Sequence, residues 1–164
     1  MKTRTFSLRR ARHEDASSII TAHRRSIREI CSQDYTPEQI EAWAGRNFQE
    51  DRWHKTMDRD FVWVVTDAEG IVRGFGHLQT PDLVQAEIAG LYLAPEVVGQ
   101  GAGHQLVQLM IEECRKQGLQ RIRLLATLTA KRFYQSCGFQ TSADRSSIEM
   151  GGVKIDCLPM ELTL

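Results

Sequence analysis

The first part of the chain carries its apolar residues at the spacing of helices. Between residues 14 and 31 they recur at intervals of three and four, which leaves most of the arginines of this stretch on other faces and predicts an amphipathic helix. A second helix is predicted after Thr36, because Thr36 is a suitable N-cap, Pro37 suits the first helical position and Gln39 completes a capping box. The stretch 46–60 predicts a short helix or an ordered loop.

From Phe61 the hydrophobic period changes to that of strands. The runs FVWVV and IVRGFGHL, joined by DAEG, predict a β-hairpin. The run LVQAEIAGLYLA predicts another strand, long enough to hold a bulge near Ala89 and Gly90. A helix over 104–118, a strand in RIRLLATL, a short helix in TAKRFYQSCGF and two strands about a Gly-Gly turn are predicted to follow. A strand, a glycine turn, a helix and a strand in this order predict at least one parallel pair in an otherwise antiparallel sheet.

Composition and charge narrow the class of protein. The 164 residues suit a single domain, 1–164, and no apolar run approaches the ~20 residues that a membrane-spanning helix needs. Lysine plus arginine and aspartate plus glutamate both number 21, so neither nucleic acid nor an anionic membrane is expected as a partner. The N-terminal segment lacks the apolar core of a signal peptide, which predicts a cytoplasmic protein. The separated cysteines and scattered histidines show no ligand spacing, so no metal is expected.

The most informative motif is the glycine-rich turn VGQGAGH at residues 98–104. It follows an apolar strand and precedes a helix, so several backbone N–H groups and the positive end of the helix dipole meet at one point, as in phosphate-binding sites. A dinucleotide fingerprint starting at Gly99 would require glycine at His104, and a Walker A motif would require GK followed by Ser or Thr. Taken alone, the turn is compatible with a phosphate site and with a plain tight turn.

The segments around this turn resemble the GNAT superfamily of N-acetyltransferases. Glu87-Ile88, the triplet LYL, Pro95, the turn, the helix and a later FYQSCGF occur in the order found in that family, over essentially the whole chain. The resemblance implies an α/β (α+β) fold with a mixed, mainly antiparallel, twisted sheet of six to seven strands and helices on both faces. Val98 departs from the arginine or glutamine usual at the first position of the turn motif, but a site built from main-chain N–H groups survives that change.

The resemblance further implies that the turn cradles the pyrophosphate of acetyl-coenzyme A (acetyl-CoA), the expected cosubstrate. Thr129 stands where the family often has an asparagine that contacts the pantetheine arm, and Arg132 is expected near the coenzyme phosphates. The expected coenzyme-binding residues are Leu91, Tyr92, Leu93, Val98, Gly99, Gln100, Gly101, Ala102, Gly103, His104, Thr129 and Arg132.

Acetyl transfer to an amine requires a base, a stabilised oxyanion and a proton for the departing thiolate. Glu87 is the only carboxylate in LVQAEIAGLYL and matches the catalytic glutamate of many GNAT enzymes, so it is the expected base, direct or through water. Tyr134 matches the tyrosine that the family places beside the coenzyme sulfur. The resemblance also implies an oxyanion contact from the N–H near Leu91. Cys137 has no partner base at a recognisable spacing, which favours direct transfer over an acetyl-cysteine.

The resemblance places the acceptor amine, of a small molecule or a peptide, under the first two helices. The expected lining residues are Ser26, Tyr35, Trp43 and His77, and packing is the alternative role for each. These helices carry no acidic cluster, which argues against a polycationic acceptor. Two other classes stay open: a catalytically silent acyl-CoA sensor, which would need only the turn, and a nucleotide-binding domain, which would need a parallel sheet and a lysine near the turn. The resemblance also allows a homodimer.

Overall fold

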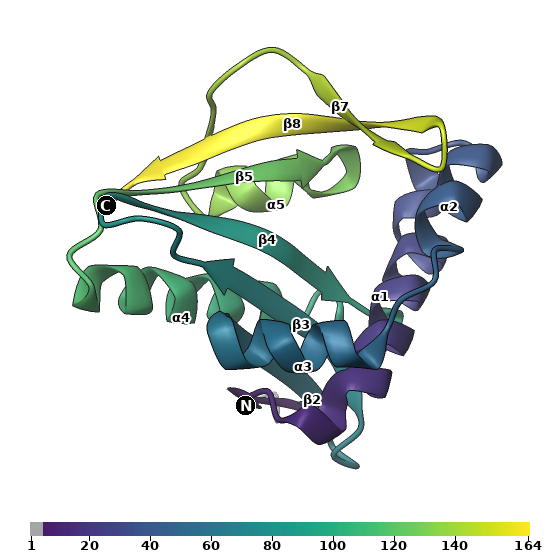
Figure 1. The fold of residues 1–164 in the computed structure, drawn as a ribbon, viewed down its shortest axis with the longest axis horizontal. Helices are drawn as coiled ribbons and strands as arrows, with labels where there is room; N and C mark the ends of the chain where they lie inside the picture. Colours follow the sequence, from purple (N-terminus) through teal and green to yellow (C-terminus); the bar gives the residue numbers. More distant parts are fainter. Residues whose placement is uncertain (1–4) are drawn as a thin grey trace.

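The computed structural model describes residues 5–164, which form one eight-stranded sheet flanked by helices (Figure 1). The strands are β1 Phe6–Arg10, β2 Phe61–Asp67, β3 Val72–Gln79, β4 Gln85–Leu93, β5 Arg121–Thr127, β6 Gln140–Thr141, β7 Ser146–Met150 and β8 Val153–Thr163. The helices are α1 Ala16–Glu29, α2 Pro37–Ala44, α3 Glu50–Arg59, α4 Ala102–Lys116 and α5 Lys131–Ser136. The sheet order is β1-β2-β3-β4-β5-β8-β6, with β7 paired to β8. Among these strands only β4 and β5 run parallel, joined by the crossover helix α4.

Local sequence signals account for several element boundaries. The Oγ1 of Thr36 accepts a hydrogen bond from the N–H of Gln39 (3.2 Å), and Oε1 of Gln39 accepts one from the N–H of Thr36 (2.9 Å). This capping box starts α2, as predicted. Gly70, with φ 80, turns the chain between β2 and β3. The predicted hairpin and parallel pair are therefore confirmed, and much of the stretch 46–60 is helical as α3.

Apolar layers cover both faces of the sheet. On one face α4 buries Leu106 and Met110 completely against the strands. On the opposite face α1 contributes Ile19, α2 contributes Trp43 and α3 contributes Trp53. The helices on both faces and the mainly antiparallel sheet confirm the predicted fold class.

A β-bulge interrupts β4 halfway along the strand. His77 of β3 pairs with Gly90, whereas the next residue, Leu78, pairs with Ile88, so Ala89 is the extra residue. An extra residue shifts the alternation of side chains by one position, and the second half of β4 presents the opposite set of residues to each face. The bulge predicted near Ala89 and Gly90 is confirmed.

The strands β4 and β5 separate beyond this bulge. Their parallel ladder ends at the pair Ile88 and Leu124. Figure 1 shows that the two strands diverge toward their C-terminal ends. The N–H of Ala94 donates to the carbonyl of Arg73 on β3 (2.7 Å). Because hydrogen bonding alternates along an antiparallel ladder, the N–H groups of Leu91 and Leu93 point away from β3, toward the side that β5 has left. Main-chain donors are thus directed into the space between the two strands.

The sheet has eight strands, whereas the resemblance implied six to seven. The strand β1 has five residues in a charged segment, and β6 has only two, too few for an alternation to be visible in sequence. Within residues 5–164, no helix has the length and apolar character required to cross a membrane.

Candidate active site

Two cavities meet where β4 leaves β5. The first, of about 510 Å³, is called here the turn cavity; it is lined by Ser26, Ile30, Cys31, Leu91, Tyr92, Leu93, Val98, Gly99, Gly101, Gly103, His104, Thr127, Thr129, Ala130 and Phe133. The second, of about 570 Å³, is called the aromatic cavity; its lining includes Tyr35, Trp43, Phe48, Trp53, Phe75, His77, Glu87 and Tyr92. Tyr92 and Thr127 line both cavities, so the two cavities adjoin at these residues.

The glycine turn exposes main-chain N–H groups at the start of α4. Gly99 has φ 76 and Gly101 has φ 91, a left-handed conformation that favours glycine. Gly101 is the N-cap residue of α4 and has no side chain to satisfy the first N–H groups of the helix. The helix has 15 residues, so its dipole adds to these donors, and the turn can bind an anion such as a phosphate.

We expect Gly101→Ala to weaken coenzyme A binding about tenfold, as measured by calorimetric titration. A Cβ at this φ costs roughly 1–2 kcal/mol, and relief of that strain would misplace the N–H groups of the turn. Gly70→Ala is the matched control, because Gly70 has φ 80 and a Cβ added there, as at Gly101, would have no atom within 4 Å. The control should lower the melting temperature and leave the affinity unchanged. An unaltered affinity in Gly101→Ala would contradict an anion-binding role for the turn.

Nine of the twelve residues predicted to bind the coenzyme line the turn cavity. The other three do not: Gln100 donates from Nε2 to the carbonyl of Glu96 (2.8 Å), Ala102 is buried in the first turn of α4, and Arg132 is exposed on α5. Ser26, predicted on the acceptor side, also lines the turn cavity. Their contacts with a coenzyme stay predictions.

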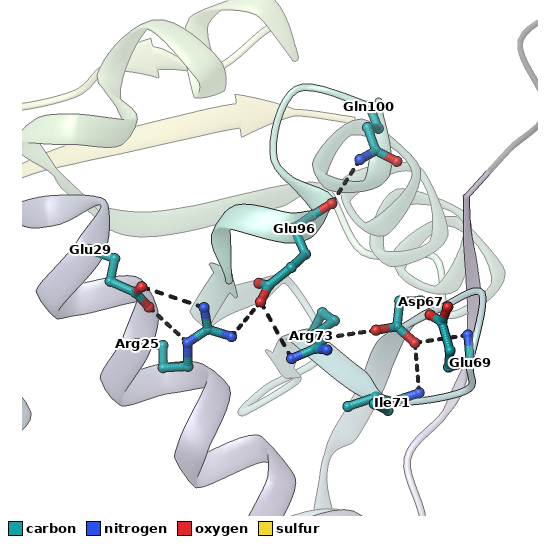
Figure 2. Close-up of polar contacts among 8 residues, drawn as sticks. All are labelled: Arg25, Glu29, Asp67, Glu69, Ile71, Arg73, Glu96 and Gln100. Carbon is teal, nitrogen blue, oxygen red and sulfur yellow. Dashed lines mark hydrogen bonds and ion pairs between the residues drawn. The ribbon is translucent and has the colours of Figure 1, made fainter.

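A chain of alternating charges fixes the turn to the rest of the fold (Figure 2). Glu96, just before the turn, contacts Arg25 of α1 (2.8 Å) and Arg73 of β3 (3.4 Å). Arg25 also pairs with Glu29, and Arg73 pairs with Asp67, each at 2.7 Å. The hydrogen bond from Arg25 holds the pKa of Glu96 below its usual range, so this carboxylate stays ionised at neutral pH. The network joins the start of the turn to α1 and β3.

Glu87 lies on β4 two residues before the bulge and lines the aromatic cavity. Its side chain is 36% exposed, and its Oε2 lies 3.7 Å from Nε of Arg123 on β5. Because the bulge shifts the alternation, Glu87 and Tyr92 line the same cavity although they are five residues apart. The carboxylate can therefore accept a proton from a molecule bound there.

Tyr134 of α5 lies in the core and lines neither cavity. Its ring packs against Phe133 (centroids 5.1 Å apart) and Phe139 (5.6 Å), and Phe133 is the neighbour that lines the turn cavity. Burial raises the pKa of Tyr134, so its hydroxyl stays protonated and can donate a hydrogen bond. Cys137 also lines neither cavity, and burial raises the pKa of its thiol.

Three of the residues predicted on the acceptor side line the aromatic cavity: Tyr35, Trp43 and His77. The hydroxyl of Tyr35 donates to the carbonyl of Asp156 (2.6 Å) and accepts from the N–H of Leu128 (2.9 Å). Tyr35 and Trp43 meet edge to face, with ring centroids 5.4 Å apart. The hydroxyl of Tyr35 thus fixes the position of the side chain through two main-chain hydrogen bonds, while Tyr35 lines the cavity.

His77 is held by Asp60, a residue that sequence reasoning missed. Nε2 of His77 lies 2.7 Å from Oδ2 of Asp60, which also accepts from Arg59 (2.9 Å) and Gln79 (3.3 Å). Burial opposes ionisation of Asp60, but these hydrogen bonds hold its pKa below the usual value, so the carboxylate accepts and Nε2 of His77 donates. Burial lowers the pKa of His77 despite this carboxylate, so its imidazole is neutral at neutral pH.

His23 of α1 is a second residue of the cavity that sequence reasoning missed. Its ring centroid lies 4.3 Å from that of Tyr92 and 5.0 Å from that of Phe48. Burial, reinforced by the charge of Arg46, lowers the pKa of His23 to about 3. Both ring nitrogens are buried without a hydrogen-bond partner in the described part of the chain. The sequence could not indicate this environment, because a histidine in an amphipathic helix pattern is as compatible with an exposed position as with a buried one.

A diverging parallel strand pair thus joins the glycine turn, which can bind an anion, to a second cavity that contains a carboxylate. A family profile described as acetyltransferase (GNAT) domain matches residues 31–164, and the chain belongs to the GNAT acetyltransferase family.

Individual relatives agree with this assignment. The chain is 30% identical to the uncharacterized N-acetyltransferase YafP of Escherichia coli (strain K12) over 118 residues, 71% of this chain and 69% of YafP. The fold is similar to a GCN5-related N-acetyltransferase structure from Rhodopseudomonas palustris, with TM-score 0.86, 23% identity and coverage of 100% and 99% of the two chains. It is also similar to the PaiA N-acetyltransferase of Thermoplasma acidophilum in complex with coenzyme A, with TM-score 0.80, 22% identity and coverage of 98% and 100%.

Proposed function

We propose that this protein transfers the acetyl group of acetyl-CoA to the primary amine of a small molecule or peptide, by direct attack in a ternary complex. The observation that carries the proposal is the junction of the two cavities at Tyr92 and Thr127, beside N–H groups of β4 that point away from β3. A coenzyme with its pyrophosphate at the turn would extend along the turn cavity to this junction. The structure of the Thermoplasma acidophilum relative in complex with coenzyme A supports the binding of this coenzyme by the same fold.

The chain offers one group for each chemical step of the transfer. Glu87 accepts the proton of the attacking ammonium, directly or through water, and frees the nitrogen lone pair to attack the thioester carbonyl. The N–H of Leu91 stabilises the oxyanion that forms. As the C–S bond breaks, the hydroxyl of Tyr134 protonates the departing thiolate, the resulting tyrosinate takes up the remaining excess proton of the attacking nitrogen, directly or through water, and the amide and coenzyme A leave as products. For this last step the hydroxyl would have to reach the sulfur at the end of the turn cavity.

Direct attack agrees with the surroundings of the cysteines. An acetyl-cysteine intermediate would require an accessible thiolate beside a base. Cys31 lines the turn cavity, but burial raises the pKa of its thiol to about 11. Cys137 lies outside both cavities. Cys157 lines the aromatic cavity, but burial raises the pKa of its thiol as well. The cysteines that line the two cavities therefore favour the protonated thiol over the nucleophilic thiolate.

The test is calorimetric titration with acetyl-CoA, followed by thiol release against a panel of amines. We expect micromolar or tighter binding and turnover of at least one amine. Tyr134→Phe should lower kcat about tenfold with unchanged acetyl-CoA affinity, because a thiolate with a pKa near ~8.5 requires only modest assistance by an acid. Binding without turnover of any amine would instead favour a catalytically silent sensor, and absence of binding would refute the coenzyme site.

A further inference from the structure

The aromatic cavity carries positive charges that no carboxylate of the described chain neutralises. Arg46, Arg52 and Lys55 line it, and none has a carboxylate oxygen within 4.0 Å among residues 5–164. Arg59, which lines the same cavity, differs because it pairs with Asp60 at 2.9 Å. The unpaired cations come from α3 and from the segment before it, on the side of the cavity formed by the α2–α3 region.

Arg46 is the most informative of these cations because it is partly buried. Its Nε donates to the carbonyl of Trp43 (3.1 Å), and its guanidinium carbon lies 4.9 Å from the ring centroid of Phe48. Its two terminal nitrogens have no hydrogen-bond partner in residues 5–164, and burial lowers the pKa of Arg46. A partly desolvated guanidinium without an anion is costly, whereas a carboxylate from a ligand would complete its hydrogen bonds in a bidentate pair.

The aromatic cavity contains a carboxylate as well as cations, and these groups come from different elements of the fold. Glu87 lies on β4, on the sheet side, while Arg46 and Arg52 lie in the α2–α3 region. The wall of the same cavity also includes aromatic rings, among them those of Trp53 and Phe75, whose centroids lie 5.0 Å apart. A ligand that matches this wall has an amine at one point, an anionic group at another and an apolar body.

We infer that the acceptor belongs to the class of amino acids: a small primary amine that carries its own carboxylate and an apolar or aromatic side chain. This inference rests on the proposed acetyl transfer and adds the substrate class. The carboxylate binds to Arg46 with support from Arg52 and Lys55, and the amine faces Glu87 and the junction of the cavities.

The experiment compares acceptors that differ only in the carboxylate: phenylalanine with phenethylamine, and leucine with 3-methylbutylamine. Thiol release from acetyl-CoA gives kcat/KM for each. We expect the amino acid of at least one pair to exceed its decarboxylated partner by about tenfold to a hundredfold, as for a charged hydrogen-bonded pair. Equal or higher kcat/KM for the decarboxylated amines would overturn the inference and leave acetyl transfer intact.

Substitution of the cations that line the aromatic cavity tests whether they cause the preference for the amino acid. Arg46→Gln, and separately the exposed double substitution Arg52→Gln with Lys55→Gln, should reduce the preference to less than about threefold, through loss of kcat/KM for the amino acid alone. The matched control is Lys116→Gln, an exposed cation at the end of α4, also without a carboxylate within 4.0 Å in the described chain, which should leave both values unchanged.

Two further outcomes separate the inference from the proposed function. Undiminished preference in Arg46→Gln and in the double variant would overturn the inference. Intact binding of acetyl-CoA with no turnover of either amino acid, while other amines react, would overturn it too and leave acetyl transfer standing. Failure of acetyl-CoA to bind would refute the proposed function itself, and the inference with it.

Discussion

Glu87→Gln is expected to lower kcat about a hundredfold at neutral pH. An alkyl ammonium with a pKa near ~10.4 is almost entirely protonated at neutral pH, and the amide of glutamine cannot accept its proton. The measurement is thiol release at saturating acetyl-CoA and amine across about pH 7 to pH 10. Because the free amine increases about tenfold per pH unit below its pKa, the deficit of the variant should shrink as the pH rises.

A matched carboxylate serves as the control for this prediction. Glu161 also lies on a strand, is 36% exposed like Glu87, and has Nη1 of Arg121 at 3.8 Å, compared with 3.7 Å from Glu87 to Arg123. Glu161→Gln should therefore reproduce any general effect of losing an exposed strand carboxylate and leave kcat unchanged. Equal activity of Glu87→Gln and Glu161→Gln, or a deficit that stays constant with pH, would contradict a role for Glu87 as the base.

The sequence predicts those parts of the fold that depend on short-range signals. The capping box of Thr36 and Gln39 starts α2, and the apolar run around Ala89 is long enough to hold a bulge, which the structure confirms. The strand β6 has two residues and gives no such signal, because it exists only through pairing with β8. Elements specified by a partner distant in sequence are the ones that periodicity does not reveal.

The candidate site likewise contains residues that the sequence predicts and residues that only the fold reveals. The glycine turn can be predicted because its main-chain conformation requires glycines. The position of Glu87 can be predicted because the segments around it follow the order found in the GNAT family. The pairing of His77 with Asp60 joins residues 17 positions apart on different segments, and the unpaired state of Arg46 depends on which carboxylates reach it in the fold. Charge counts cannot show this, because 21 basic and 21 acidic residues balance over the whole chain while the aromatic cavity retains unpaired cations.

The buried imidazole of His23 predicts a stability that falls in mild acid. In the unfolded chain its pKa is near ~6.5, whereas burial lowers the folded value to about 3. Between these values the unfolded state binds the additional proton, so the stabilising contribution is complete above about pH 6.5 and decreases as the pH falls toward 3. At about 1.4 kcal/mol per pH unit, lowering the pH from 7 to 5 should cost about 2 kcal/mol through this residue.

Urea unfolding of the wild type and of His23→Leu at pH 7 and pH 5 measures this contribution. The absolute stability of the variant also reflects the fit of leucine among Tyr92 and Phe48. The relevant quantity is therefore the change in the free energy of unfolding between pH 7 and pH 5. That difference should be smaller by about 2 kcal/mol in His23→Leu, and unchanged in His104→Leu, which removes an exposed histidine. If both variants lose the same free energy as the wild type between pH 7 and pH 5, His23 is accessible to protons in the folded state. The imidazole would then be a polar group of the acceptor site that can change charge in mild acid.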